Sequence, residues 1–192
     1  MQPRPLEPIP ELRTERLRLR APDLEDAEAL AAIYGDPEVG RYLGFRLIHR
    51  TEQMREKLAR DLEAVRRGEG MRWVLCAHAD AAPAGYVGIF SWSQRDRRAE
   101  VGYVVARELW GQGVMKELFP ALLHFGFGRM GLHRLEARVD SRNGASLRVL
   151  LRAGFQVEGV LREHHVAEPE GFGDTTLLAL LEGEWRRGYS HT

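Results

Sequence analysis

A glycine turn between a predicted strand and a predicted helix is the segment of this sequence best suited to bind an anion. The strand covers 99–106, the glycines are Gly111 and Gly113, and the helix runs to about Met130. Backbone amides in such a turn are unpaired and converge near the positive end of the helix, which suits a phosphate or pyrophosphate. A tight structural turn explains the same glycines equally well. The dinucleotide-binding fingerprint is excluded, because it requires glycine or alanine where this chain has Lys116.

Residues that can bind a metal or act as a covalent nucleophile are few. His164 and His165 are adjacent, and neighbours in a strand point to opposite faces, so we do not expect them to share a metal. No cysteine or further carboxylate spacing supports zinc, so no metal site is predicted. Cys76 is the single cysteine and lies in the apolar run 73–77. This position predicts a reduced, buried thiol rather than a nucleophile or a disulfide.

Hydrophobic patterning predicts a mixed α/β domain around one sheet, covering residues 13–192. Residues 1–12 contain four prolines and are predicted to form an extended tail. The expected order is strand, two helices, three strands, helix, strand, helix and two strands. Strands are expected at about 16–20, 72–79, 84–92, 99–106, 135–139, 155–162 and 174–182, and helices after 22, at about 51–67, from 113 to about 130 and from 143 to 154.

Single residues mark the ends of several predicted helices. Asp23 and Asn143 occupy N-cap positions, and Gly154 stands where a helix-terminating glycine is expected. Pro120 is unusual, because a proline inside a helix removes a hydrogen bond and clashes with the carbonyl four residues earlier, here that of Lys116, at a cost of ~3 kcal/mol. We therefore predict a kink at Pro120, or a helix that restarts near it.

Composition places the chain among ordinary globular proteins and excludes several classes. It has 192 residues, 28 basic and 28 acidic side chains and 44% apolar residues. A formal charge of zero argues against nucleic-acid binding, which needs an excess of basic residues. The N-terminus has no apolar signal segment and no apolar run is long enough to span a bilayer, so we expect a cytoplasmic protein away from membranes. The basic set is 26 Arg and two Lys, which reflects coding bias, selection for stability or a phosphate-binding surface.

A series of short motifs resembles the GNAT acetyltransferases, and within them the RimJ/RimL-type protein N-terminal acetyltransferases. Each motif is short, but their order and spacing together are specific. They are TERL at 14–17, DPEV at 36–39, AEVGY at 99–103, WGQG at 110–113, GLHRLEARVD at 131–140, NGAS at 143–146, AGF at 153–155 and EGVLRE at 158–163. The resemblance implies the GNAT fold, in which helices flank a central mixed, mostly antiparallel twisted sheet.

The resemblance also implies a site for acetyl-CoA as co-substrate. The pyrophosphate loop of the family maps onto 110–115, with Trp110 in place of Arg or Gln and Met115 in place of a small residue. We expect Trp110 to pack, and we expect binding to tolerate Met115 because the contacts are made through backbone N–H groups. The amides implied to face the pyrophosphate are those of Gln112, Gly113, Val114, Met115 and Lys116.

Three further residues are implied to contact the donor. Val104 and Val105 end a strand that, in the family, separates from its neighbour and pairs with the pantetheine amides. A backbone N–H there would also polarise the acetyl carbonyl. Asn143 is implied to contact the pantetheine arm, and a plain N-cap role explains it equally well.

Acetyl transfer needs a neutral amine, although a free α-amino group has a pKa of ~7.7–8.0. The resemblance implies Ser146 as the acid for the departing thiolate, and a first-turn serine bonded to backbone is the alternative. Glu100 and His165 are the two candidate bases. Glu100 is otherwise expected to pair with Arg95, Arg97 or Arg98, and His165 to be a surface histidine.

We therefore expect direct transfer of an acetyl group from acetyl-CoA to a primary amine, with the N-terminal α-amine of a protein or peptide as the acceptor. Segments 36–50 and 165–174 are expected to form the acceptor groove, and Asp174 to order the second segment or face the substrate. Residues 107–152 carry a net charge of +4 and residues 153–192 a net charge of −4, which suits a phosphate-rich donor and a cationic acceptor.

The alternatives are a small amine acceptor, such as a polyamine, amino acid or antibiotic, and a non-catalytic acyl-CoA-binding module. Relatives often form dimers, so a homodimer is possible.

Overall fold

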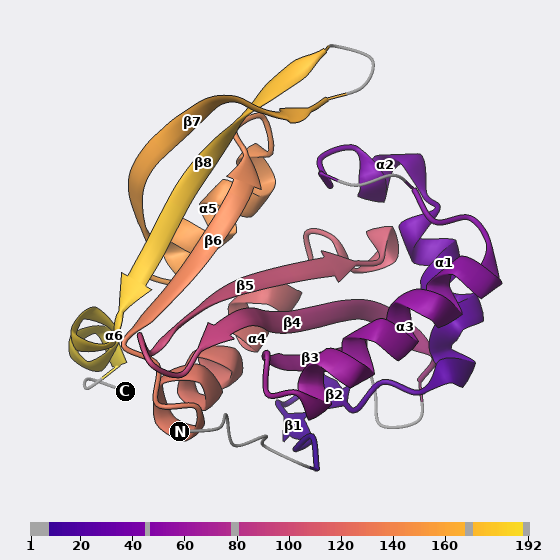
Figure 1. The fold of residues 1–192 in the computed structure, drawn as a ribbon, viewed down its shortest axis with the longest axis horizontal. Helices are drawn as coiled ribbons and strands as arrows, with labels where there is room; N and C mark the ends of the chain where they lie inside the picture. The colour runs from indigo at the N-terminus through magenta and orange to yellow at the C-terminus, as the bar shows by residue number, and fades with distance from the viewer. Residues whose placement is uncertain (1–7, 45–46, 78–80, 168–170, 190–192) are drawn as a thin grey trace.

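The computed structural model describes residues 8–44, 47–77, 81–167 and 171–189, and within them shows an eight-stranded sheet with helices on both faces (Figure 1). The strand order is β1-β2-β3-β4-β5-β6-β8-β7. Neighbouring strands are antiparallel except β5 and β6, which are parallel. This arrangement confirms the predicted fold class. The strands are β1 (Leu12–Arg13), β2 (Arg18–Arg20), β3 (Met71–Cys76), β4 (Pro83–Ser93), β5 (Arg98–Val105), β6 (Arg134–Asp140), β7 (Gln156–Val166) and β8 (Phe172–Leu181).

Helices α1, α3, α4 and α5 bury apolar side chains, and the core forms two clusters. Leu30 and Leu58 belong to a cluster beneath α1 and α3, and Phe119 and Phe155 to a larger cluster on the side of α4 and α5. The bounds are η1 (Leu24–Asp26), α1 (Ala27–Tyr34), α2 (Pro37–Gly40), α3 (Thr51–Arg66), η2 (Arg107–Leu109), α4 (Val114–Leu123), η3 (His124–Arg129), α5 (Gly144–Arg152) and α6 (Glu182–Tyr189).

The predicted helix caps are present. The Asp23 carboxylate accepts from the N–H of Glu25, and Asp26 completes a capping box by accepting from the N–H of Asp23 at 2.7 Å. Asn143 caps α5, and Gly154 follows that helix with a φ of 96°, a left-handed conformation that favours glycine. These caps were predictable because each depends on residues close together in sequence.

Strands β5 and β6 are paired only over their first three residues. The register joins Arg98 to Arg134 and ends with Glu100 opposite Glu136, whereas β5 continues to Val105. In Figure 1 the two strands move apart beyond this point, and α2 faces the opening. The β6-facing edge of residues 101–105 is therefore released from the hydrogen bonding of the sheet. This divergence positions the site discussed below.

Pro120 lies inside α4 without ending it. The α-helix continues through Pro120, and the hydrogen bonding changes only at His124, where the π-helical segment η3 begins. The N–H of Met130 donates to the carbonyl of Phe125, the five-residue spacing of a π-turn. The expected restart at Pro120 is therefore wrong, because the buried side chains before and after the proline hold the helix against the sheet.

Four short elements, β1, α2, η2 and α6, were absent from the sequence-based prediction. β1 lies at the end of the predicted tail, most of which is outside the described residues. The described part of that segment contacts the core, since the indole N–H of Trp73 donates to the carbonyl of Pro10 at 2.8 Å and Leu12 packs against buried residues. Such short elements depend on distant contacts, and their own sequence carries no periodic pattern.

Gly85 in β4 provides a test of the sheet beside the opening. A Cβ at Gly85 would lie 2.6 Å from the backbone oxygen of Val104 in β5, which cannot move without disturbing the pairing of the two strands. We expect Gly85→Ala to lower the free energy of unfolding, measured by urea denaturation, by ~1–3 kcal/mol. Gly159→Ala in β7 is the matched control, because a Cβ there has no atom within 4 Å. Equal losses in the two variants would contradict this account.

Candidate functional site

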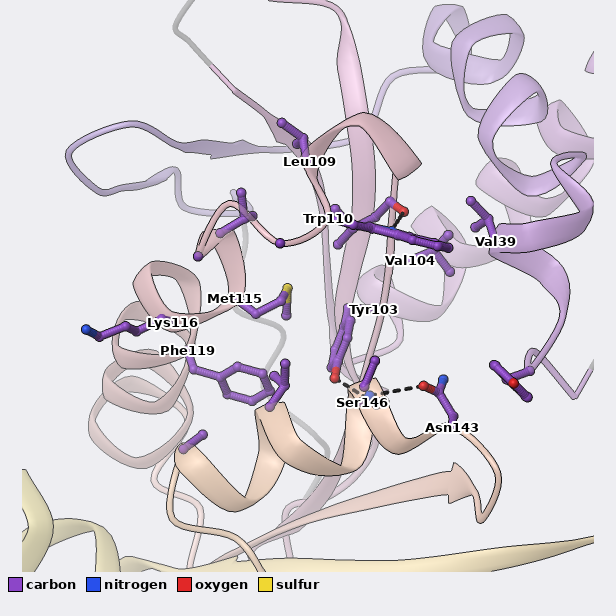
Figure 2. Close-up of a pocket in the computed structure, with 18 of the residues that line it drawn as sticks. Val39, Tyr103, Val104, Leu109, Trp110, Met115, Lys116, Phe119, Asn143 and Ser146 are labelled. Carbon is purple, nitrogen blue, oxygen red and sulfur yellow. Dashed lines mark hydrogen bonds between the residues drawn. The ribbon is translucent and has the colours of Figure 1, made fainter.

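A cavity of about 800 Å³ opens at the end of β5 that leaves β6 (Figure 2). Its walls come from the end of β5, the turn and first half of α4, the start of α5, and α2 with the residues after it. Large apolar side chains form much of the wall, among them Val39, Leu109, Met115 and Phe119. The cavity therefore combines an apolar interior with the polar start of a helix.

Eight of the eleven predicted site residues line this cavity and three do not. The eight are Val104, Val105, Gly113, Val114, Met115, Lys116, Asn143 and Ser146. The other three, Gln112, Glu100 and His165, are outside the lining. The segment 36–50, expected to face the acceptor, contributes the wall residues Glu38, Val39, Arg41, Tyr42 and Leu43. Residues 45–46 of that segment, and 168–170 of the segment 165–174, are outside the described residues.

The glycine turn has the conformation that its sequence predicts. Gly111 and Gly113 have φ values of 72° and 74°, which are strained for other residues. Gly113 is the N-cap of α4 and supplies no side-chain cap. The N-cap residue therefore leaves the first-turn amides at the positive end of α4 without a side-chain cap, and this end borders the cavity.

The N-terminal motif at 14–17 holds this turn from outside. The carboxylate of Glu117, in the first turn of α4, accepts from the hydroxyl of Thr14, and from the backbone N–H and the Nε of Arg16, both at 2.7 Å. The guanidinium of Arg16 also donates to the carbonyl of Gln112 at 3.2 Å. These hydrogen bonds lower the pKa of Glu117, although its partial burial acts to raise it. The Gln112 carbonyl is thus held by Arg16. Sequence reasoning missed this contact because it joins residues about a hundred positions apart.

Trp110, which was expected to pack, lies against the end of β5. Its side chain lines the cavity, the residue is 48% exposed, and its indole N–H donates to the carbonyl of Val105 at 2.9 Å. The half-exposed position arises because the turn directs the ring across the end of β5, where the carbonyl lies. Trp110 therefore forms a half-exposed wall of the cavity (Figure 2).

Asn143 and Ser146 sit together at the start of α5. The Oδ1 of Asn143 accepts from the N–H of Ser146 at 3.0 Å, so the N-cap role is present. The Ser146 hydroxyl lies 2.8 Å from the hydroxyl of Tyr103 in β5. Tyr103 also lines the cavity and was not singled out from the sequence. The strand motif at 99–103 contains Tyr103, but nothing local indicated that it would meet a helix forty residues later.

Glu100 lies where β5 and β6 part. Its partner is Arg138 of β6, at 3.5 Å, rather than Arg95, Arg97 or Arg98. The expectation was wrong because the parallel register with β6 brings Arg138 within reach of the carboxylate. Burial raises the pKa of Glu100 above that of an ordinary glutamate, Arg138 acts against this, and neighbouring Glu136 adds to it.

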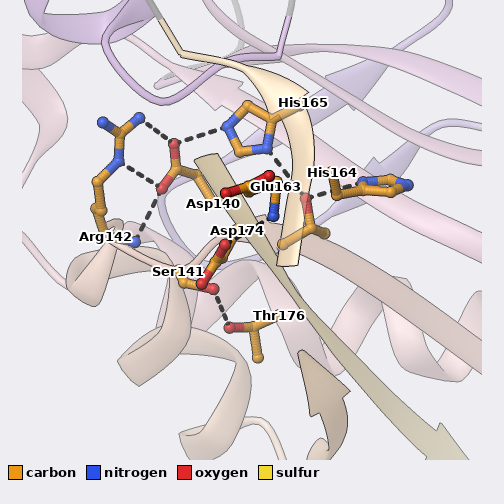
Figure 3. A network of polar contacts seen from close by, with 9 residues as sticks. Asp140, Ser141, Arg142, Glu163, His164, His165, Asp174 and Thr176 are labelled. Atoms are coloured by element: carbon orange, nitrogen blue, oxygen red, sulfur yellow. Dashed lines mark hydrogen bonds and ion pairs between the residues drawn. The ribbon is translucent and has the colours of Figure 1, made fainter. Parts of the chain in front are cut away.

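His165 is bound at both ring nitrogens (Figure 3). Its Nε2 lies 3.0 Å from the Oδ2 of Asp140, and its Nδ1 lies 3.2 Å from the hydroxyl of Thr175. His164 also reaches Thr175, at 3.1 Å, and the two rings lie on opposite sides of β7 as drawn in Figure 3. A bulge at Glu163, whose φ is 50°, shifts the register of β7 here.

The carboxylates of this region have structural partners. Asp174 accepts from the backbone N–H of Glu163 at 2.8 Å and so holds the bulge in β7. Asp140 is bound by the side chain and backbone of Arg142 and by His165. Burial acts to raise the pKa of Asp140, but these hydrogen bonds outweigh it and lower the pKa to about 2.

A family model described as "Acetyltransferase (GNAT) domain" matches residues 16–156, which is most of the chain. The chain belongs to the GNAT acetyltransferase family. It is 36% identical over 156 residues, 81% of this chain and 88% of the other, to the protein named "Uncharacterized N-acetyltransferase YoaA" of Bacillus subtilis (strain 168). The predicted family and the predicted class of enzyme, an N-acetyltransferase, are thereby confirmed.

Solved structures of GNAT enzymes share the fold of this N-acetyltransferase. The ribosomal-protein-S5-alanine acetyltransferase of Vibrio fischeri superposes with a TM-score of 0.81 at 20% identity, covering 92% of this chain and 98% of that chain. The spermidine N-acetyltransferase of Vibrio cholerae, solved with CoA and spermine, superposes with a TM-score of 0.79 at 20% identity, covering 88% and 98%. The two neighbours act on different amines, and at this identity they show the fold alone.

Three other expectations concern features away from the cavity. Cys76 is fully buried, as predicted, and its burial raises the pKa of the thiol. Within the described ranges, no group of three or more His, Cys, Asp or Glu residues is arranged to hold a metal. Among those same residues, no helix has the length and apolar character needed to cross a membrane.

The lowered pKa of Asp140 predicts a pH-dependent contribution to stability. A carboxylate with a depressed pKa stabilises the folded protein above the pKa of the unfolded chain, ~3.9, and loses this effect as the pH falls further. We expect Asp140→Asn to lower the free energy of unfolding at pH 7 by ~1–3 kcal/mol. In urea denaturation, the difference from the wild type should shrink between pH 4 and about pH 2. Glu52→Gln, at an exposed position in α3, is the control, and a difference for Asp140→Asn that persists at low pH would contradict the assignment.

Proposed function

We propose that the protein transfers an acetyl group directly from acetyl-CoA to the α-amine at the N-terminus of a protein or peptide. The observation that carries the proposal is the separation of β5 from β6 beyond Glu100, with an apolar cavity at the freed end of β5. A free strand edge offers backbone groups to an amide-containing chain such as pantetheine. We assign that edge, at Val104 and Val105, to the donor. Because Trp110 already occupies the Val105 carbonyl, we expect the pantetheine to use the other backbone groups of this edge.

The start of α4 is the proposed pyrophosphate site. Amides of Gly113, Val114, Met115 and Lys116 would bind the phosphate oxygens, supported by the positive end of the helix. Lys116 and Arg152 line the same cavity and add positive charge. Gln112 is assigned a supporting part here, because its carbonyl is bound to Arg16 and orients the peptide that follows. The side chain of Met115 lies in the cavity wall, so its backbone N–H can still donate to a phosphate oxygen.

Glu100 is the proposed base and acts through a water molecule. Its raised pKa and its place where the strands part support this role. His165 is the weaker candidate. The Asp140 carboxylate can only accept a hydrogen bond, so in a neutral His165 the proton is on Nε2. The basic lone pair is then on Nδ1, where it faces the Thr175 hydroxyl rather than a substrate. We therefore assign His165 to positioning within the network of Asp140 and Arg142.

The remaining steps follow from the chemistry of thioesters. The neutral amine attacks the acetyl carbonyl, and a backbone N–H at Val104 or Val105 stabilises the oxyanion. The bond between carbon and sulfur then breaks, and the hydroxyl of Ser146 donates a hydrogen bond to the departing thiolate. An acyl-enzyme is not proposed, because Cys76 is buried away from the cavity and its burial raises the pKa of the thiol.

The acceptor is assigned to the opening between α2 and the β7–β8 hairpin. The β7–β8 hairpin extends beyond β6 on the side of the sheet where α2 lies (Figure 1). Val166 and Phe172 leave exposed apolar surface near the tip, 62% and 66% exposed, which suits the side chains of a peptide. The second candidate is a small amine such as a polyamine, and it is favoured by the fold shared with a spermidine acetyltransferase.

An acceptor screen tests the proposal. Purified protein is incubated with acetyl-CoA and either ribosomal-protein N-terminal peptides or small amines, and free thiol is measured. We expect thiol release and an acetylated α-amine with at least one peptide. Preference for polyamines or amino acids would favour the second candidate. Binding of acetyl-CoA without transfer to any amine would instead identify a non-catalytic acyl-CoA-binding module.

The base assignment predicts a specific pH dependence. A base with a raised pKa becomes protonated, and inactive, at a higher pH than an ordinary glutamate, so kcat should fall as the pH drops through that value. We expect Glu100→Gln to lose this inflection and ~10²–10⁴-fold of kcat. Glu136→Gln, the residue opposite in the β5–β6 register, is the matched control and should keep an inflection, moved to lower pH because Glu136 contributes to the raised pKa of Glu100. An inflection lost in His165→Ala but kept in Glu100→Gln would reverse the assignment.

A further inference from the structure

The cavity contains a pair of hydroxyl groups that the proposed reaction does not fully use. The Oη of Tyr103 in β5 lies 2.8 Å from the Oγ of Ser146 in α5, and both side chains line the cavity (Figure 2). Tyr103 comes from the strand whose free edge we assign to the donor. The pair therefore joins the two elements between which the thioester would lie.

Either hydroxyl of this pair can be the donor, and the surroundings of Tyr103 favour the phenol. The ring packs edge-on against Phe119, with centroids 5.7 Å apart and planes at 90°. Burial raises the pKa of Tyr103 to about 12, although the bond to Ser146 acts against this, so the phenol keeps its proton. Among the described residues, Ser146 is the one hydrogen-bond partner of the Tyr103 hydroxyl. Because this half-buried phenol keeps its proton, we assign the Tyr103 O–H as the donor and the Oγ of Ser146 as the acceptor.

The geometry of Ser146 then leaves its own proton for the cavity. A serine hydroxyl has one donor and two acceptor positions. Tyr103 occupies one acceptor position, and the backbone of Ser146 is fixed because its N–H donates to Asn143 at 3.0 Å. No backbone acceptor for the Ser146 hydroxyl is present among the described residues, which removes the alternative of a serine bonded to its own helix. With Tyr103 assigned as the donor, the proton of Ser146 stays available to a ligand in the cavity.

We propose that Tyr103 is a positioning residue for the leaving group: it donates to the Oγ of Ser146, so that the Ser146 hydroxyl donates to the sulfur of CoA as the C–S bond breaks. This inference rests on the proposed function. When the C–S bond breaks, its electron pair stays on sulfur, the new C–N bond forms, and the proton of the amine passes to the base. The thiolate receives a hydrogen bond from Ser146 and later a proton from solvent.

Such a hydrogen bond is strongest when sulfur is negative, because a charged acceptor roughly doubles its strength. The pair therefore stabilises thiolate over thiol and over thioester. This difference gives a measurable property that needs no amine acceptor: the pKa of the thiol of bound CoA should be lowered. A tyrosine with only a packing role would leave that pKa unchanged.

The test is a pH titration of CoA bound to the full-length protein, following the ultraviolet absorbance of the thiolate. We expect the pKa of the bound thiol to be about one unit higher in Tyr103→Phe than in the wild type, a tenfold change in ionisation. Ser146→Ala should raise it at least as much, and the double variant should add little. Ser146→Thr, which keeps the hydroxyl, should restore the wild-type value and so guards against a misfolded variant.

Tyr86→Phe is the matched control. Tyr86 lies in β4 and donates to Asp61 at 2.9 Å, so the variant also loses a tyrosine hydroxyl bond, but away from the cavity, and the thiol pKa should not change. CoA that binds with the same thiol pKa in wild type, Tyr103→Phe and Ser146→Ala would overturn this inference alone. A wild type that binds no CoA would overturn the proposed function and the inference with it.

Discussion

The early end of the parallel pairing between β5 and β6 is the constraint on which the site depends. A parallel pair normally continues for the length of its strands, but here the register ends with Glu100 opposite Glu136. The freed backbone of β5 borders a cavity closed by α4 on one side and α5 on the other. Every residue to which we assign a chemical role lies on the freed strand, at the start of one of these helices, or where the strands part.

The first turns of α4 and α5 differ in how they are capped. At α4, Gly113 provides no side-chain cap, and Arg16 and Thr14 hold the turn through Glu117 and the Gln112 carbonyl. The amides there are left for a ligand. At α5, Asn143 caps the helix itself, which fixes the backbone of Ser146. In the proposed reaction, one helix offers backbone donors to an anion, whereas the other offers a hydroxyl to a leaving group.

Local features of the fold and site could be predicted from the sequence, and contacts between distant segments could not. The glycine turn, the caps and the order of strands depend on neighbouring residues, and the family motifs placed eight site residues at the cavity. The ion pair of Glu100 with Arg138, the Tyr103–Ser146 bond and the Asp140–His165 contact depend on strand register. The bulge at Glu163 is also a feature that no local residue pattern indicated.

The central claim is that CoA binds along the freed edge of β5 with its phosphates at the start of α4. The most direct measurement is a crystal structure of the protein with CoA bound. The account predicts pantetheine beside residues 101–105, with phosphate oxygens about 3 Å from the amides of residues 113–116. CoA bound elsewhere, or phosphates without contact to these amides, would contradict it.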